Sequence, residues 1–171
     1  MRSVIFEKTH KKTLMSPNIG ITPANLKKSA SILGTILSNE MTLYVKTRKF
    51  HWNISGNSFM ELHKLFEEQY RILEAQIDEV AERINQLGEK TIGTMKEFID
   101  NSTLKESPKE YASQKHMLSE LLENHEQLVT EFRSYIPIFE EETKDIGSAD
   151  FVTGLLQEHE KMAWILRRYQ V

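Results

Sequence analysis

The 171-residue sequence contains no cysteine, so neither a disulfide framework nor a thiolate metal site can form. It has only seven glycines and four prolines, so few positions interrupt regular structure. No apolar run approaches the roughly 18 residues that a membrane-spanning helix needs. The opening stretch MRSVIFEKTHKK lacks the apolar centre of a secretory signal, and we therefore expect a cytoplasmic protein.

Excess charge of either sign is also small. The net charge of −3 provides no general attraction to nucleic acid. Hydrophobic residues make up 39% of the chain and charged residues 27%, which is typical of a soluble globular domain. The length fits a single domain with a sizeable core.

Residues 1–21 are the one locally basic stretch. Their cations include Arg2, Lys8, Lys11 and Lys12, with only Glu7 opposing them. Pro17 and Gly20 then interrupt any helix, so we predict a separate N-terminal arm followed by a folded domain over residues 22–171. Two interpretations of the arm stay open: a mobile, solvated terminus, or a segment that contacts DNA phosphates. Many copies in one assembly would strengthen such weak DNA binding by avidity.

The rest of the chain contains four long stretches in which apolar residues recur every three or four positions, a pattern typical of amphipathic helices. The expected helices cover about residues 22–50, 59–87, 113–142 and 150–169. Thr22 and Pro23 give the first a strong start signal, and a Ser58/Glu61 capping box precedes the second. Pro137 should kink or split the third, and Asp150 is the expected N-cap of the fourth.

Between the second and third helices lies a connection of about 25 residues, too long for a plain loop. A short helix is expected within it over residues 95–99. Two long helices, one long crossover and two more long helices predict an all-α four-helix bundle. His116 and His125 of the third helix are expected to face solvent or to make local bonds.

The second helix has a stripe of metal-ligand side chains. With His63 at zero, a rotation of about 100° per residue places Glu67 at about 40°, Asp78 at about 60° and Glu82 at about 100°. Imidazole and carboxylate are the ligand types that hold divalent iron, manganese or zinc. The spacing also fits an ordinary solvated helix face, which is how we interpret Glu68, Glu74 and Glu79.

One helix cannot close a site with this stripe, because His63 and Glu82 lie about 28 Å apart along its axis. A second copy packed antiparallel about a twofold axis near residues 72 and 73 would bring the two ends together twice per dimer. A carboxylate from another helix of the same chain is the alternative. His51 follows the first helix, where it either caps the last carbonyl groups or acts as a further ligand.

The run from His51 to Arg83 closely resembles the Dps proteins, the DNA-binding proteins from starved cells, which are miniferritins of the ferritin-like superfamily. The matching residues are His51-Trp52-Asn53, Gly56, Phe59, Leu62-His63, Phe66-Glu67, Asp78 and Ala81-Glu82-Arg83. The resemblance extends to Leu43-Tyr44 and to the C-terminal His159-Glu160-Lys161 and Trp164-Ile165-Leu166-Arg167, so it covers nearly the whole chain.

The resemblance implies a ferritin-like four-helix bundle that assembles as a hollow cage of twelve subunits. It implies a di-iron ferroxidase centre at each twofold interface, with two irons held by His51, His63 and Glu67 of one subunit and Asp78 and Glu82 of the other. Fe(II) would be oxidised there by hydrogen peroxide or oxygen, Fe(III) mineral would be stored, and DNA would be protected from oxidative damage. Trp52 would lie beside the centre and either trap oxidising equivalents or simply pack there.

The sequence departs from the family pattern in two places. The family often shows Asp-x-x-Thr-x-Asp near the start of the last helix, associated with an iron-entry pore. Here Asp150 and Thr153 are followed by Gly154 and Leu155, so Asp145 and Asp150 are the remaining pore candidates.

The basic arm is also modest. It supports an alternative function, a nucleoid-associated stress protein that compacts DNA. A purely structural bundle without metal is the third hypothesis.

The four long helices contain no Glu-x-x-His, which argues against a centre inside one subunit.

Overall fold

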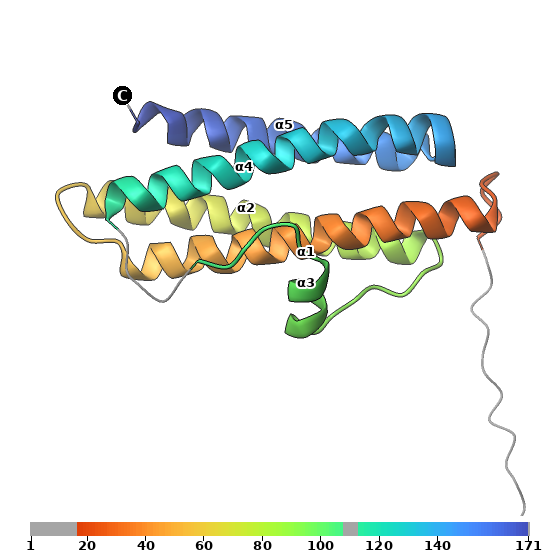
Figure 1. Ribbon diagram of the computed structural model, residues 1–171, viewed down its shortest axis with the longest axis horizontal. Helices are drawn as coiled ribbons and strands as arrows, with labels where there is room; N and C mark the ends of the chain where they lie inside the picture. The colour runs from red at the N-terminus through yellow and green to blue at the C-terminus, as the bar shows by residue number, and fades with distance from the viewer. Residues whose placement is uncertain (1–16, 108–112, 171) are drawn as a thin grey trace, which may run out of the picture.

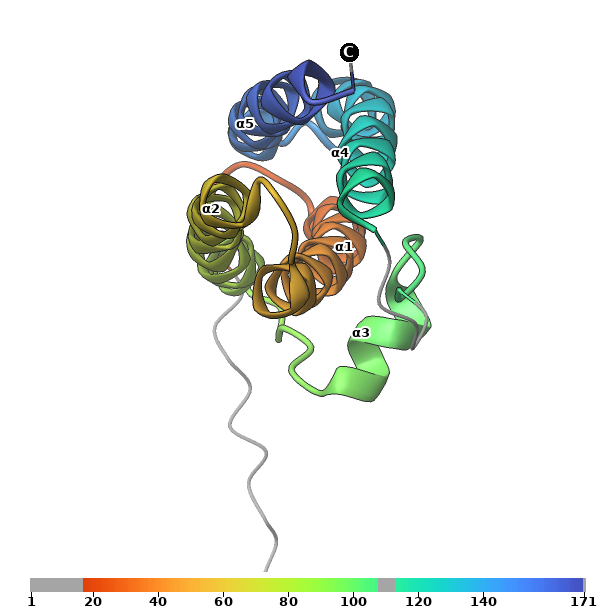
Figure 2. The same cartoon turned by 90° about the vertical axis from the view of Figure 1, so that its left-hand side faces the viewer.

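The computed structural model describes residues 17–107 and 113–170, and these form helices joined by short connections, without a strand. The elements are α1 (Pro23–Asn53), α2 (Phe59–Gln86), α3 (Met95–Asn101), α4 (Gln114–Pro137), the π-helix η1 (Ile138–Thr143) and α5 (Ile146–Arg168). Figure 1 shows α1 and α2 as one antiparallel pair and α4 and α5 as a second pair above them. Viewed along the bundle, the four long helices occupy its corners and α3 lies outside, next to α1 (Figure 2). The predicted four-helix bundle with a crossover helix is confirmed.

The start of α1 is as expected. Thr22 is its N-cap and accepts a hydrogen bond from the Asn25 backbone N–H, and Pro23 is the first helical residue. The helix continues to Asn53, three residues beyond the predicted end, because the Ile54 N–H still bonds to the Phe50 carbonyl. His51 and Trp52 therefore lie in the last turn of α1, which fixes their directions.

The predicted capping box at Ser58 and Glu61 is wrong. Ser58 is the N-cap of α2, but its side chain makes no capping hydrogen bond. A complete capping box instead begins α3, where the Thr94 side chain accepts from the Glu97 N–H and the Glu97 carboxylate accepts from the Thr94 N–H. Gly88 follows α2 with φ of +85°, as its position after the helix predicts.

The second half of the bundle corrects two boundaries. Pro137 ends α4 as an α-helix, but the chain continues as η1 rather than breaking. A single left-handed residue, Lys144, then turns it, so the predicted turn over residues 143–149 is much shorter. The N-cap of α5 is Asp145 and not Asp150, because the Asp145 side chain accepts from the Ser148 N–H and also pairs with Arg83 of α2.

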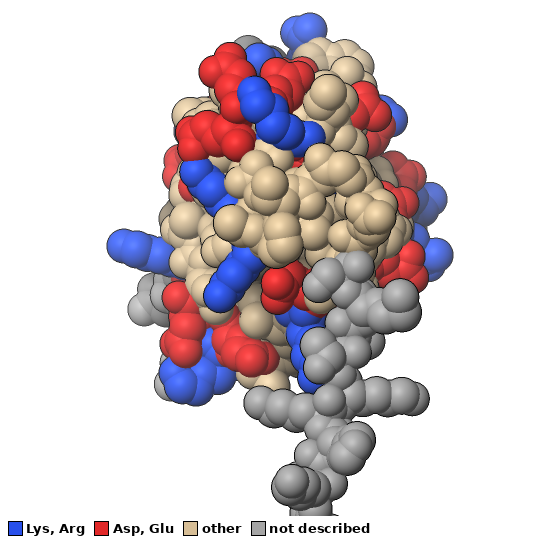
Figure 3. All heavy atoms as spheres, turned by 90° about the vertical axis from the view of Figure 1, so that its right-hand side faces the viewer, with Lys and Arg blue, Asp and Glu red and all other residues tan. Residues whose placement is uncertain are grey.

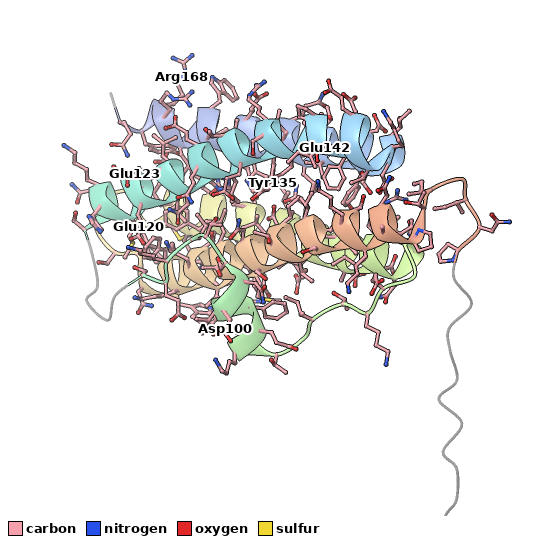
Figure 4. The ribbon with its side chains drawn as sticks, turned by 45° about the vertical axis from the view of Figure 1, so that its right-hand side comes forward. Asp100, Glu120, Glu123, Tyr135, Glu142 and Arg168 are labelled. Carbon is pink, nitrogen blue, oxygen red and sulfur yellow. The ribbon has the colours of Figure 1, made fainter. Side chains whose placement is uncertain are left out.

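The four long helices bury a continuous apolar core in which Phe50, Phe66, Phe132 and Phe139 are the largest side chains. Side chains fill the space between the two helix pairs (Figure 4). Polar residues are buried there too, among them Glu40, His125 and His159, each with no exposed surface. The expectation that His125 faces solvent is therefore wrong.

Basic and acidic side chains are mixed over the end of the bundle in Figure 3, without a patch of one sign. Within residues 17–107 and 113–170, no helix has the length and apolar character needed to cross a membrane.

Candidate metal centre

Two histidines meet where α1 ends and α2 begins. The antiparallel packing of these helices stacks the His51 ring on the His63 ring, with centroids 3.8 Å apart. The Nδ1 atom of His51 lies 2.8 Å from the backbone carbonyl oxygen of His63. The Nδ1 atom of His63 lies 3.0 Å from the backbone carbonyl oxygen of His51. Each ring is thus fixed by the backbone of the other helix.

This reciprocal pairing determines which nitrogen of each ring is free. A carbonyl oxygen can only accept, so both Nδ1 atoms must carry a hydrogen and donate it. In the neutral ring the Nε2 atom then has an unshared electron pair, which is the form that binds a metal ion. In this geometry the Nε2 atoms of His51 and His63 could bind a metal ion.

Glu67 lies one helical turn beyond His63 and is half-buried. Its Oε1 atom accepts two hydrogen bonds from Arg71, with the Nε atom at 3.1 Å. These bonds, together with the positive charge of Arg71, lower the pKa of the Glu67 carboxyl. An ionised carboxylate is thereby held next to the two imidazoles, and Arg71 engages only one of its oxygens.

Aromatic side chains surround the pair. The Tyr70 ring meets the His51 ring edge-on at 5.2 Å, and Phe59 lies 5.1 Å from His63. The Arg48 guanidinium sits over the rings of Tyr70 and Trp52, at 4.5 and 5.5 Å from their centroids. Trp52 is 65% exposed, and its role beside the centre remains a prediction.

Sequence reasoning did not identify Arg48 and Tyr70 as neighbours of the centre. Arg48 precedes Trp52 by four residues, so the two side chains lie on the same face of the helix. This spacing could have indicated that Arg48 lies beside Trp52.

Asp78 and Glu82 are not brought to the histidines within one chain. Both are exposed on α2, and Asp78 lies about 22 Å further along the axis than His63. Next to Asp78 is a shallow groove whose lining includes Ala75, Ala81 and Arg71. Small side chains there would allow another helix to approach closely. In the described part of the chain, no group of three or more His, Asp or Glu side chains is placed to hold a metal ion.

The two pore candidates differ in their surroundings. Asp145 is 1% exposed, and its Oδ1 atom lies 2.9 Å from Nη2 of Arg83, so its carboxylate is used inside the subunit. Asp150 is exposed on the first turns of α5. A pore role for either residue stays a prediction. The proposed DNA contacts Arg2, Lys8, Lys11 and Lys12 lie outside the described residues.

Known proteins are similar to this chain in both sequence and fold. A ferritin-like domain model matches residues 30–170. An uncharacterised low-temperature-induced protein of Nostoc is 40% identical over 152 residues, which is 89% of this chain and 85% of that protein. DNA protection during starvation protein 2 of Bacillus anthracis is 31% identical over 143 residues, covering 84% of this chain and 97% of that protein.

Comparison with solved structures leads to the same group of proteins. The crystal structure of the Dps protein of Vibrio cholerae, described as a member of a broad superfamily of ferritin-like diiron-carboxylate proteins, superposes with a TM-score of 0.85. The two are 29% identical, and the match covers 91% of this chain and 97% of that one. Sequence, fold and the matched domain agree, and the chain belongs to the Dps family of ferritin-like proteins.

Proposed function

We propose that the protein is a ferroxidase and iron store. It oxidises Fe(II) at centres shared between two subunits, with hydrogen peroxide as the oxidant and oxygen as a slower one, and it stores the Fe(III) product as mineral inside a cage of twelve subunits. Acting in the cytoplasm, it would protect DNA by removing the iron and peroxide that together damage it. The names of the starvation-protection relatives and the diiron description of the Vibrio cholerae protein support this proposal.

The observation that carries the proposal is the reciprocal bonding of His51 and His63. Because both Nδ1–H groups donate to backbone carbonyls, the two Nε2 atoms are left with free electron pairs, and the ionised Glu67 follows His63 by one helical turn. This donor set of neutral imidazole and carboxylate suits Fe(II) and binds it less tightly than thiolates would. Iron can therefore enter as a substrate and leave as a product.

A second subunit supplies the missing carboxylates in this proposal. Antiparallel packing of two α2 helices about an axis near residues 72 and 73 sets His63 and Glu67 opposite Glu82 and Asp78 of the partner subunit. Each centre would hold two irons. The three carboxylates would then offset about three of the four positive charges of two Fe(II) ions and about half of the charge of two Fe(III) ions.

The reaction needs two electrons. Each of two Fe(II) ions gives one electron to hydrogen peroxide, the O–O bond breaks, and two hydroxide ions form with two Fe(III). Two irons at one centre thus reduce the peroxide completely without releasing a hydroxyl radical. In this scheme His51 and His63 hold iron through Nε2, and Glu67, Asp78 and Glu82 bind and neutralise it.

The test uses iron-free protein. Fe(II) is added without oxygen, then hydrogen peroxide or oxygen is added in separate runs, and Fe(III) is followed by its ultraviolet absorbance. We expect rapid oxidation by peroxide, slower oxidation by oxygen, and loss of both in the His51→Ala, His63→Ala, Asp78→Ala variant.

Glu67→Gln should also slow oxidation. Glu68→Gln, which changes an exposed neighbouring carboxylate, is the matched control and should not. Oxidation by the wild type at the rate of buffer alone would refute the proposal.

A further inference from the structure

A second group of titratable side chains lies inside the bundle, outside the candidate metal centre. Glu40 of α1, His125 of α4 and His159 of α5 have no exposed surface. The Nε2 atom of His159 is 2.9 Å from Oε1 of Glu40, and its Nδ1 atom is 2.9 Å from Nδ1 of His125. The three side chains form a line of carboxylate, imidazole and imidazole, which we call the Glu40–His159–His125 trio.

The trio is arranged for protons and not for a metal ion. Its members bond to one another in sequence, and they are not among any group of metal-ligand side chains that surrounds a common point in the described residues. Each of the two short contacts needs one hydrogen between its atoms, because two unprotonated acceptors at that distance would repel. The ring edge of Phe132 closes one side, with its centroid 5.4 Å from that of His159.

Because the trio is buried, its net charge determines how many protons it holds in the folded protein. With Glu40 ionised and both imidazoles neutral, the trio has a net charge of −1. One added proton, shared between Glu40 and His159, makes it neutral. A second added proton makes it positive. An uncompensated charge in an apolar interior is costly, so the neutral, one-proton form is favoured.

The surrounding helices provide no other charge to change this balance. Lys46 of α1 is buried, but its Nζ atom lies 2.9 Å from Oε1 of Glu120 on α4 and also bonds Asn124. Figure 4 labels Glu120 near the start of α4. Glu131 of α4 is held by Asn39 and Thr103.

The remaining neighbours are neutral or paired. The polar side chains that α2 buries are Gln69, Gln76 and Tyr70, which are uncharged near neutral pH. The buried residues of η1 are Phe139 and Thr143. Asp145, the N-cap of α5, is paired with Arg83. Burial, and secondarily the charge of His159, hold the pKa of His125 well below its usual range, in agreement with a neutral outer imidazole.

We propose that the Glu40–His159–His125 trio is a pH-sensitive element built into the bundle core, which holds one proton when folded and destabilises the subunit when the surroundings become either more acidic or more alkaline. The unfolded chain has no such constraint, since its glutamate and two histidines titrate independently. The difference between the two proton counts determines how stability changes with pH.

The direction follows from ordinary pKa values of about 6.5 for histidine and 4.3 for glutamate. Near about pH 6.5 the unfolded side chains together also hold about one proton, so stability is greatest there. At lower pH the unfolded chain binds more protons than the trio, and stability falls. At higher pH it binds fewer, and stability falls again. The unfolding constant should rise about tenfold between about pH 6.5 and 5, and by a similar factor up to about pH 8.

Two variants separate the two sides of this profile. Glu40→Gln removes the shared proton, so the loss of stability on the alkaline side should disappear while the loss on the acidic side should grow to more than about a hundredfold in the unfolding constant. His125→Gln leaves the Glu40–His159 pair, so the acidic loss should shrink to within about twofold while the alkaline loss remains. His116→Gln, which changes an exposed histidine of α4, is the matched control and should keep both sides.

The measurement is urea unfolding of the iron-free full chain at one protein concentration, from about pH 5 to 8. A uniform loss of stability in both variants, with the wild-type pH profile unchanged, would show that the trio only packs and would overturn the proposal.

Histidine NMR of the wild type gives a second test that does not depend on the variants folding. Two of the six histidines should keep constant chemical shifts across that range. If every described histidine titrates near its ordinary pKa, the trio does not hold its proton as proposed. Zinc binding that survives His51→Ala, His63→Ala but is lost with His159→Gln would also refute it, because the trio would then be a metal site.

Discussion

Mixing two inactive variants tests whether the iron centre is shared between subunits. One chain has His63→Ala and keeps Asp78 and Glu82, and the other has Asp78→Ala, Glu82→Ala and keeps the histidines. Because Asp78 is about 22 Å from His63 along the same helix, neither chain can complete a centre alone. Each homodimer should therefore be inactive.

A mixed dimer has a different composition. At one of its two centres the intact histidines of the second chain face the intact carboxylates of the first, and at the other centre both sets are missing. Random pairing of equal amounts makes about half of the dimers mixed, so roughly a quarter of all centres should be complete. Coexpressed chains should thus oxidise Fe(II) with about a quarter of the wild-type initial rate per subunit.

The matched control replaces the second chain with Glu79→Ala, which removes an exposed carboxylate next to Asp78. All centres then keep their carboxylates, and only those built on His63→Ala chains fail, so about half of the activity should remain. No activity in the first mixture, with half in the control, would refute the shared centre. Activity of the Asp78→Ala, Glu82→Ala chain on its own would instead place the missing carboxylates at other positions of the same chain.

Three further predictions concern stability, each measured by urea unfolding. Asp145→Asn should destabilise the protein by about 2 kcal/mol, because Arg83 loses its buried partner, whereas the exposed Asp150→Asn should stay within about 0.5 kcal/mol; equal effects would contradict a stabilising Arg83–Asp145 ion pair. Gly88→Ala should cost about 1–2 kcal/mol, because its φ is +85° and a Cβ would lie 2.5 Å from Cδ of Pro17, while Gly154→Ala, with open space around it, should be neutral or stabilising by about 0.5–1 kcal/mol. Thr22→Ala should cost about 1 kcal/mol and Ser58→Ala close to none, since only Thr22 makes a capping bond; a larger loss at Ser58 would contradict the described cap.

The long helices could be predicted because the repeat of apolar residues depends only on the chain itself. Their ends could not all be predicted, because some depend on distant partners. The two aspartates Asp145 and Asp150 offer equally good N-cap chemistry in sequence. Arg83 decides between them, and it lies 62 residues away from Asp145. Likewise, Ser58 and Glu61 have capping-box spacing, but the chain enters α2 without forming the bond.

For the candidate centre, the sequence predicted which residues take part but not the hydrogen bonds that orient them. The choice of His51, His63 and Glu67 followed from the helix stripe and the family resemblance. The structure pairs the two histidines, and the ligand role of all three residues stays a prediction. The reciprocal bonds to backbone carbonyls could not be foreseen, because they depend on how far α1 extends beyond Phe50. That extension places His51, predicted as either a helix cap or a ligand, inside the last turn of α1 with a fixed ring orientation.

The trio was missed although a signal for it existed. Glu40 falls between Ile36 and Leu43 at core spacing, and His125 falls between Leu121 and Leu128 in the same way. A polar residue within an apolar stripe indicates burial, and two such residues on different helices indicate a contact. What sequence could not provide was the pairing of His125 with His159, which depends on the register of α4 against α5.

Charge favours the subunit edge over the bundle interior as the place for the proposed iron chemistry. Ferritin-like diiron sites inside a bundle use glutamates from several helices, supplemented by histidines. Here the interior offers one carboxylate, Glu40, which would offset one of the four positive charges of two Fe(II) ions. The proposed edge centre has three carboxylates and remains open to solvent until a second subunit covers it. In the two proposals, the interior histidines therefore take part in holding a proton, whereas the edge histidines act as iron ligands together with carboxylates.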